Sequence, residues 1–476
     1  MANYDVNPLR VTVSDITIEK FGGKDKMSLM PQFVELTFYQ SLFEPSISAE
    51  LGINDQIGLF VNYPLTGEEL ITINYQQDSL IEYQSGYKKT LKFIIKGIRN
   101  ILIDDRARST LFVMDLVSPF YLQNARKLVS QWYNDRIELS ALSLYNDYIG
   151  IDTGLLYDIY KPMNVENTIK VRDLIVPSLR PFQALQWLAK QAIAEQPENY
   201  FLFMFYEDID SFNFVTMQSL IEKGLNNKTD LIDKKYKYYA DNIISIKDPS
   251  GDPEEKLKLI TNMIVNKRNS SVEKIVGGYY QNELFEINML TKSYHSTPTE
   301  LSETQRDTKF SLERWPLNTP DYIKYVKNAN NVINSEYSNR IRYIINNWPE
   351  YNTGVKEGES NPMFRQKFGN TAKYLNALNQ VDLTITVPAN MDFKVGDVIW
   401  VDIPENHGFN NVSFDPYISG LFIVVEVKQV LGAGYQAATS LRIYKDGAFN
   451  SLLENSQYNV TYPSISSSGN KILGTV

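Results

Sequence analysis

Residues 33–53 read FVELTFYQSLFEPSISAELGI and carry the clearest structural pattern in the first part of the chain. Val34, Leu36 and Phe38 alternate with more polar residues, so we expect them on one face of a β-strand. The pair Glu44-Pro45 interrupts this alternation. The period of two resumes at four apolar positions: Ile47, Ala49, Leu51 and Ile53. Two successive strands joined by a proline-containing turn are therefore predicted.

Working outward from this stretch, the pattern extends over the first 120 or so residues. Further strands are predicted at Leu70–Tyr75, Thr90–Ile98 and Thr110–Ser118, separated by Gly, Pro and Asn residues. Short strands with this punctuation favour a closed or nearly closed barrel over a parallel sheet.

The middle of the chain has a different pattern, typical of helices followed by a hairpin. A helix is predicted from Pro119 to about Asn134, and a clearer one over Pro181–Gln196, where proline suits the first helical position. The buried face of the second helix is predicted to comprise Phe182, Leu185, Leu188, Ala189, Ala192 and Ile193. The apolar run Tyr200–Tyr206 predicts a strand, and Phe212–Thr216 predicts its return after an acidic turn.

Between the hairpin and the second β region, the polar segment Gly224–Asp233 is predicted to be a linker. Asp252-Pro253 is typical of a helix start, with Leu257, Ile260 and Ile264 as the buried face. Ile275–Tyr294 is predicted to be a strand, bent at Gly277-Gly278.

Residues 295–367 are polar and form a predicted inserted subdomain, with a helix expected near Tyr322–Asn346. From Lys373 onward the β pattern returns, with a turn at Lys394–Asp397. Strands are expected where Leu383, Ile385 and Val387 alternate, and at Val398–Ile403, Leu421–Val430 and Ser440–Tyr444. After Phe449 the sequence is rich in serine. No repeat between the two β regions is detectable in the sequence.

These patterns predict a β-rich α+β fold with two barrel-like β domains, a helical and hairpin middle domain and a polar inserted subdomain. The expected divisions are 1–119 for the first barrel-like domain, 120–235 for the middle domain, 236–294 with 368–449 for the second barrel-like domain, 295–367 for the insertion and 450–476 for a C-terminal tail.

Composition excludes several classes of function. The chain has no cysteine and two histidines, so disulfides, thiolate metal sites and cysteine nucleophiles are excluded and histidine chemistry is scarce. The net charge of −9 disfavours non-specific nucleic-acid binding, although DNA could pass an acidic wall without binding to it. No apolar run approaches the roughly 20 residues of a membrane span, and no secretory signal is visible at the N-terminus.

Few residues are candidates for chemistry. Glu207, Asp208 and Asp210 form the densest acidic cluster, which fits a glycosidase pair or a calcium site less well than a hairpin turn capped by Asp. His295 and His407 lack identifiable partners, and no phosphate-binding or nucleophile motif is present. We therefore predict no catalytic, cofactor-binding or metal-binding residues and no cofactor.

Two compositional features concern partners. The basic run Lys234–Lys237 follows acidic residues and is interpreted as a solvated linker and not as a nucleic-acid site. The 31 tyrosines and 23 phenylalanines favour extensive protein–protein interfaces, because rigid aromatic side chains are enriched at such contacts.

Three stretches give the chain a resemblance to the central hub proteins of T4-like contractile phage baseplates. The first is Val34–Phe43 with the strand after it, and the second is the helix and hairpin of Phe182–Ala194 and Tyr200–Val215. The third combines Ile275–Tyr280 with the late strands Phe393–Ile399 and Gly420–Lys428. They follow the order expected for the family over most of the chain. The polar regions near Gly224–Asn266 and His295–Met363 are larger here than in the best-known members.

The resemblance implies a non-catalytic virion protein of the tail baseplate, assembled in the host cytoplasm. It implies a homotrimer with two barrel-like domains per chain, so that six similar domains form a ring between a three-fold spike and a six-fold tube. The implied partners are the central spike, the tail tube initiator, the tape-measure protein and the baseplate wedge proteins. DNA would pass through the lumen without specific binding, and no membrane partner is implied.

Two other functions stay open. One is a glycan-binding or glycan-hydrolysing protein of the same virion, which would place carboxylates in a cleft. The other is the spike hub of a bacterial secretion system, which is disfavoured because no needle-like repeat follows Phe449.

Overall fold

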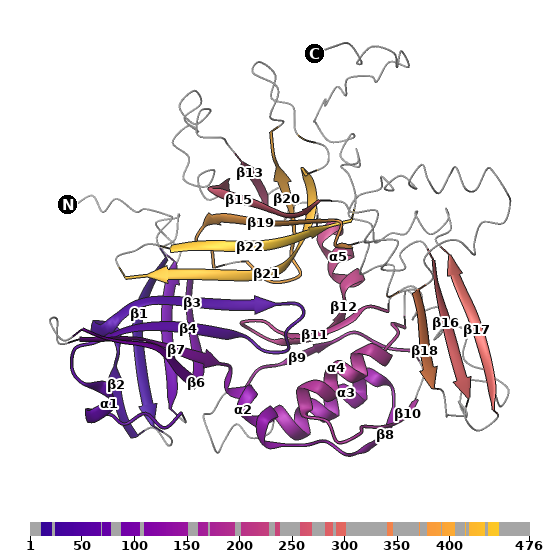
Figure 1. Cartoon of the computed structure of the whole chain (residues 1–476), viewed down its shortest axis with the longest axis horizontal. Helices are drawn as coiled ribbons and strands as arrows, with labels where there is room; N and C mark the ends of the chain where they lie inside the picture. The colour runs from indigo at the N-terminus through magenta and orange to yellow at the C-terminus, as the bar shows by residue number, and fades with distance from the viewer. Residues whose placement is uncertain are drawn as a thin grey trace, which may run out of the picture.

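The structure is a computed structural model, and its described part is β-rich with a smaller helical layer, which confirms the predicted α+β class (Figure 1). The described residues are 11–20, 24–67, 69–77, 87–104, 109–150, 160–169, 172–195, 201–227, 234–238, 258–268, 281–288, 292–300, 340–345, 371, 378–391, 393–404, 415, 418–433 and 437–446. None of the helices in this part of the chain combines the length and the apolar content of a membrane span.

The elements follow one another in three groups along the chain. The N-terminal group contains β1 (Val11–Lys20), β2 (Lys24–Ser28), the 3-10 turn η1 (Met30–Gln32), β3 (Phe33–Ser41), β4 (Ser48–Asp55), α1 (Leu59–Asn62), β5 (Leu70–Gln77), β6 (Tyr87–Asp104) and β7 (Ser109–Val117). The middle group contains α2 (Pro119–Arg126), β8 (Trp132–Asp135), α3 (Ile137–Tyr145), the π-helical turn η2 (Asn146–Gly150), β9 (Met163–Val165), β10 (Arg172–Ile175), α4 (Pro181–Gln191), β11 (Phe203–Glu207), β12 (Phe212–Thr216) and α5 (Met217–Asn226).

The C-terminal group contains β13 (Lys235–Tyr238), β14 (Leu259–Ile260), β15 (Asn262–Arg268), β16 (Gln281–Asn288), β17 (Ser293–Glu300), β18 (Arg340–Ile345), β19 (Val381–Pro388), β20 (Val398–Asp402), β21 (Gly420–Gly432) and β22 (Ala437–Lys445). Strands β16, β17 and β18 form a small sheet of their own, in which β16 lies between the other two.

One antiparallel ladder connects the two ends of the chain. Its strands pair in the order β15, β19, β22, β21, β3, β4, β7 and β6. At its centre β21 pairs with β3, with Leu431 opposite Leu36 and Gln429 opposite Phe38. Strands from distant parts of the sequence therefore share one sheet (Figure 1).

The ladder contains an internal repeat that no sequence pattern indicated. The N-terminal unit consists of β3, β4, β5, β6 and β7, and the C-terminal unit consists of β15, β19, β20, β21 and β22. In the N-terminal unit β3 pairs with β4, β4 with β7, and the long strand β6 with both β5 and β7. In the C-terminal unit β15 pairs with β19, β19 with β22, and the long strand β21 with both β20 and β22. All of these pairings are antiparallel. The repeat is therefore one of topology, in agreement with the absence of a detectable repeat in the sequence.

The registers of the two units also correspond. Leu51 faces Met114 in the N-terminal unit, and Ile385 faces Leu441 at the equivalent place in the C-terminal unit; all four side chains are buried. Each long fourth strand has a register shift at the same point, between Ile95 and Gly97 in β6 and between Val424 and Glu426 in β21. Strand β6 has a second shift, between Arg99 and Leu102, which β21 lacks, so residues beyond it are matched through their partners in the last strand.

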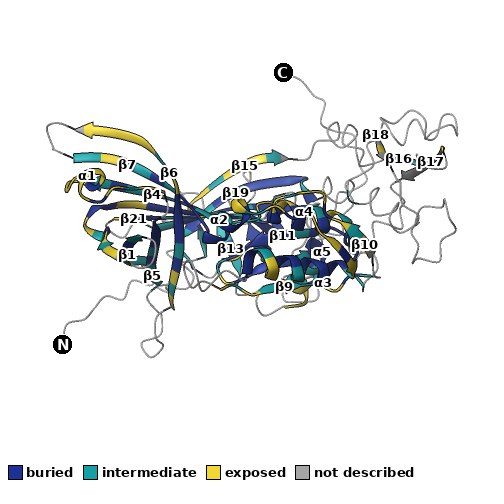
Figure 2. Cartoon of the chain, turned by 90° about the horizontal axis from the view of Figure 1, so that it is seen from below, coloured by how far each residue is buried: buried dark blue, intermediate teal, exposed yellow. Residues whose placement is uncertain are grey.

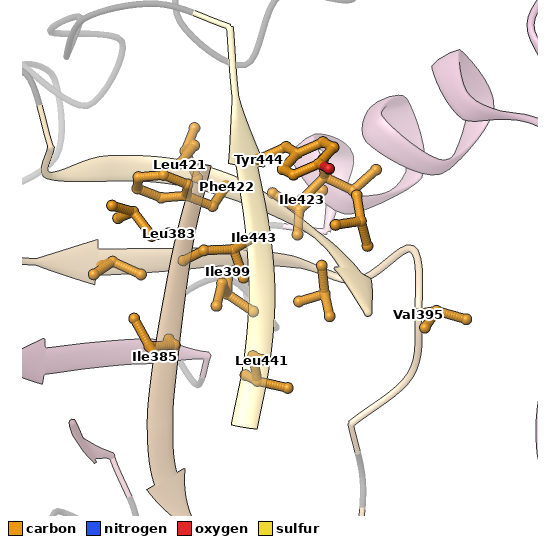
Figure 3. Packing of buried hydrophobic residues seen from close by; sticks show 14 of the residues in the cluster. Leu383, Ile385, Val395, Ile399, Leu421, Phe422, Ile423, Leu441, Ile443 and Tyr444 are labelled. Carbon is orange, nitrogen blue, oxygen red and sulfur yellow. The ribbon is translucent and has the colours of Figure 1, made fainter. Parts of the chain in front are cut away.

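Three hydrophobic cores lie beneath this sheet and the helices. The N-terminal core lies under β1 and β3–β7, the helical core is formed by α2–α4 with β11 and β12, and the C-terminal core is formed by β19–β22 with α5. Figure 3 shows Leu383 and Ile385 of β19 beside Leu441 and Ile443 of β22 in the C-terminal core.

The predicted helices are shorter than expected. Helix α2 ends at Arg126, and the end of the predicted segment lies in β8, which starts at Trp132 and pairs with β10. Helix α4 starts at Pro181 as predicted but ends at Gln191, because Ala192 adopts an extended conformation. The apolar face of α4 is buried as predicted.

Three other helix or linker predictions are wrong in the described residues. Gly224 lies inside α5, so the predicted linker begins as a helix. Ile260 and Ile264 lie in strands β14 and β15, because pairing with β13 and β19 overrides a local spacing that also suits a helix; residues 251–257 lie outside the described part. In the helix predicted near Tyr322–Asn346, Arg340–Ile345 forms strand β18 instead, and residues 322–339 lie outside the described part.

Two strand predictions also change. The predicted strand Ile275–Tyr294 contains β16 and the start of β17, while residues 275–280 lie outside the described part. Val34 is exposed, because the register between β3 and β4 shifts at this residue and turns its side chain away from the core. The strands of the described residues form an open ladder, and no closed ring of pairings is present among them.

Candidate functional site: the hairpin between three cores

The β11–β12 hairpin lies where the three cores meet. Alternate residues of a strand point to opposite faces, and the two faces of this hairpin enter different cores. The helical core receives Phe203, Phe205, Phe212 and Phe214. The C-terminal core receives Leu202 and Tyr206, and Ile209 of the turn packs against the N-terminal core. The hairpin therefore joins regions that are far apart in the sequence.

Glu207 at the end of β11 fixes the hairpin to the N-terminal unit. Its buried carboxylate accepts hydrogen bonds from the backbone N–H of Ile47 at 3.1 Å and from the hydroxyls of Ser46 at 3.1 Å and Ser118 at 2.8 Å. The Lys161 ammonium, 2.6 Å away, supplies the opposite charge. A buried carboxylate with this set of donors is a structural anchor, since its oxygens are occupied by the protein.

Asp208 shapes the turn itself. One carboxylate oxygen accepts from the backbone N–H groups of Asp210 at 2.7 Å and Ser211 at 2.6 Å. The other oxygen accepts from the side-chain amide of Asn213 at 2.9 Å. This arrangement is the Asx type of turn that the sequence favoured over a catalytic or calcium site.

Asp210 connects the two β units through the hairpin. Its carboxylate lies 2.9 Å from the ammonium of Lys89 in β6 and 2.8 Å from that of Lys394 before β20. Burial alone would raise the pKa of Asp210, but hydrogen bonds from Lys394 and Lys89 outweigh it and lower this pKa below 3.8. The ion pairs favour the charged carboxylate.

The cluster predicted from sequence is thus brought together by the fold, but each acid has a structural partner set. Its donors, Lys161, Lys89 and Lys394, were missed, because they come from distant segments without a motif. Burial, together with the charge of Asp208, raises the pKa of the neighbouring Tyr206. Among the described residues, no group of three or more acidic or histidine side chains is arranged to hold a metal ion.

The remaining candidates do not form a site in the described part of the chain. His295 lies in β17, with Glu286 as its cross-strand neighbour, while His407 and Gly277-Gly278 lie outside the described residues. The predicted linker at Lys234–Lys237 is wrong, because Lys235–Tyr238 forms β13. Lys234 and Lys235 pair with carboxylates of Asp397 and Asp402 at 3.0 and 2.8 Å.

Comparison with known proteins identifies a distant relative. No protein-family model matches the chain. A probable baseplate hub protein of Vibrio phage KVP40 is 21% identical over 294 residues, which cover 62% of this chain and 64% of the relative. The aligned region is therefore somewhat less than two thirds of that protein's length.

A solved prophage tail protein has a similar fold. The 43 kDa tail protein of prophage MuSo2 from Shewanella oneidensis aligns with a TM-score of 0.50 and 10% identity, covering 91% of this chain and 99% of that one. A tail protein from Neisseria meningitidis MC58 aligns with a TM-score of 0.49 and 12% identity, covering 91% and 97%. The chain is therefore distantly related in sequence to a probable phage baseplate hub protein and similar in fold to a prophage tail protein, which confirms the resemblance predicted from the sequence.

Proposed function

We propose that this chain is a non-catalytic baseplate hub that forms a homotrimeric ring and adapts a three-fold central spike to a six-fold tail tube. The observation that carries this proposal is the internal repeat. Two units with the same strand order and pairing occur in each chain, so three chains would supply six similar units. A ring with three-fold symmetry in its chains and near six-fold symmetry in its units can contact partners of both symmetries.

We assign the two barrel-like domains of this hub to the two units of the ladder. The domain divisions proposed are 1–119, 120–235, 236–294 with 368–449, the insertion 295–367 and the tail 450–476. The antiparallel junction of β21 with β3 supports this assignment, since it joins the units side by side within one sheet. The hairpin contacts the N-terminal unit through Glu207 and Asp210 and reaches Lys394 before β20 through Asp210, which supports a middle domain that is held against both units.

The partners follow from this place in the tail. We propose that the ring contacts the spike on one side and the tube initiator on the other, with the tape-measure protein inside and the wedge proteins outside. DNA would cross the lumen without specific binding, and the net charge of −9 supports this, because an acidic wall repels phosphate. The site of action would be the baseplate of the virion tail.

The mass of the purified protein in solution tests the proposal. Light scattering should give three times the mass of the chain, at concentrations where a nonspecific aggregate would show a spread of masses. A single chain mass would contradict the proposal, and release of sugars from peptidoglycan or surface polysaccharide would favour the glycan-hydrolase alternative.

A further inference from the structure

The two units differ at one edge of their long fourth strands. In the C-terminal unit, β20 pairs with the first part of β21 as far as Ile423, and β3 takes over the same edge from Glu426 to Gly432. In the N-terminal unit, β5 pairs with the first part of β6 as far as Ile94. Among the described residues, no strand pairs with this edge beyond Ile94. The position that β3 fills beside β21 is open beside β6.

The open part of β6 is apolar and exposed. Ile101, Leu102 and Ile103 expose 52%, 63% and 73% of their surface. They lie near the tip of the β6–β7 hairpin, which extends beyond the rest of the sheet at the end of the molecule where α1 lies (Figure 2). Such an edge, with free backbone hydrogen-bonding groups and apolar side chains, is a template for another strand.

The other end of the ladder presents the strand that matches this edge. Strand β15 is the counterpart of β3, and among the described strands it pairs with β19 alone. Its Ile264 and Val265 expose 53% and 43% of their surface. The equivalent residues of β3, Thr37 and Phe38, are buried, and β3 has β21 beside it.

The correspondence of the registers gives the pairing. Leu102 is equivalent to Val430, since both lie opposite equivalent residues of the last strand, Leu111 and Ala438. Val430 pairs with Thr37, whose equivalent in β15 is Ile264.

Repeating the β21–β3 junction therefore places Leu102 opposite Ile264 of another chain and Ile103 opposite Met263. In this register the exposed Leu102 faces the exposed Ile264, and the exposed Ile103 faces Met263, which is partly buried against the C-terminal core.

We propose that β6 of one chain pairs, from Ile98 onward, with β15 of the next copy in an antiparallel ladder with Leu102 opposite Ile264. This inference rests on the proposed ring and specifies its interface. The contact joins different surfaces of the two copies, so it is head-to-tail and closes only at a fixed number of chains. If it repeats the junction inside the chain, each of six junctions turns by about 60° and three chains close the ring.

Engineered disulfides test the register, and the absence of native cysteine makes the test clean. The double variant Leu102→Cys with Ile264→Cys should form disulfides between copies on mild oxidation, because directly opposed residues of an antiparallel pair have the required spacing. Most chains should run as covalent multimers on a denaturing gel without reductant, up to a closed trimer. Each single variant should stay a monomer on the gel.

A matched pair controls for chance collisions. Leu102→Cys with Ile175→Cys combines the same β6 position with a similarly exposed residue of β10, and it should give at least tenfold less cross-linked product. Equal cross-linking in both pairs would overturn the proposed register. A trimer by light scattering that does not cross-link at Leu102 and Ile264 would overturn this interface and leave the proposed function standing. A monomer by light scattering would overturn both.

Charge substitutions provide a second readout that does not depend on disulfide geometry. Leu102→Asp and Ile264→Asp should each shift the mass in solution from three chains toward one, with an unchanged circular dichroism spectrum, because both side chains are exposed in a single chain. Leu102→Asp combined with Ile264→Lys should restore the larger mass, since the opposed charges would then attract. Retention of the trimer in both single variants would contradict the interface.

Discussion

The N-terminal and C-terminal units are built to the same plan and differ in what lies beside their long strands. The C-terminal unit has β3 along the second part of β21, whereas the equivalent edge of β6 has no strand beside it in the described part of the chain. Equivalent core positions are filled by different residues, such as Leu51 and Ile385. The repeat is thus preserved in strand order and pairing, while the edges determine which residues are buried within one chain and which are available to another.

The largest expected effect is a difference in stability loss between substitutions at two equivalent positions, one in β3 and one in β15. Phe38 is buried against Phe93 and Tyr75, so Phe38→Ala should lower the free energy of unfolding by about 3–5 kcal/mol. Its equivalent Val265 is exposed, so Val265→Ala should cost under about 1 kcal/mol in the separated chain. Urea unfolding of the two variants measures the two losses, and equal losses would contradict the difference in burial between the two positions.

The next effect concerns the anchor between the N-terminal unit and the hairpin. Glu207→Gln removes the charge that the Lys161 ammonium faces in a buried site, so stability should fall by about 3 kcal/mol. Glu426→Gln is the control, because the Glu426–Arg442 pair is exposed and should contribute under about 1 kcal/mol. If thermal unfolding shows similar losses for both variants, Glu207 is not an anchor.

A smaller effect is expected where a helix covers the C-terminal unit. A Cβ atom at Gly224 of α5 would lie 2.4 Å from Cγ2 of Val398 in β20, so Gly224→Ala should cost about 1–3 kcal/mol through overpacking. Val398→Ala in the same chain should recover part of this loss by making room. Additive losses in a double-mutant cycle followed by urea unfolding would argue against this contact.

The smallest effect is a dependence on pH across the bridge between the units. The pKa of Asp210 is lowered in the folded chain, so its ion pairs with Lys89 and Lys394 stabilise the fold above pH 3.8, and this contribution is lost as pH falls through the lowered pKa. The carboxylate is half exposed, so the contribution should be under about 1 kcal/mol.

Asp210→Asn should therefore make the free energy of unfolding less dependent on pH below about pH 4 and less dependent on salt. The mass of the assembly in solution should stay the same. Stability curves of wild type and variant measured from neutral to acidic pH provide the test. Parallel curves over the whole range would show that the bridge contributes nothing.

The sequence predicted elements whose signals are local. Pro181 and the apolar spacing after it located α4, and the aromatic alternation around the acidic turn located the β11–β12 hairpin. Ile260 and Ile264 fit a helix equally well by spacing, and only their pairing with distant strands makes them extended. The turn role of Asp208 was predictable, because Asp bonds its own backbone.

The long-range organisation could not be predicted from these signals. The pairing of β3 with β21 joins the two ends of the chain, and nothing in Leu36 or Leu431 specifies the other. The repeat could not be read from residue patterns, because equivalent positions share burial and pairing but not residue identity, as Met114 and Leu441 illustrate. The lysine partners of the acidic turn, Lys161, Lys89 and Lys394, could not be predicted either, because they lie far from the turn in the sequence.

Electron microscopy of the purified protein viewed along its symmetry axis tests the central claim most directly. We expect a ring of three chains. Its class averages should show six similar units around an open centre, with three-fold differences contributed by the middle group and the small β16–β18 sheet. A particle with a single copy, or a ring in which the number of similar units equals the number of chains, would contradict it.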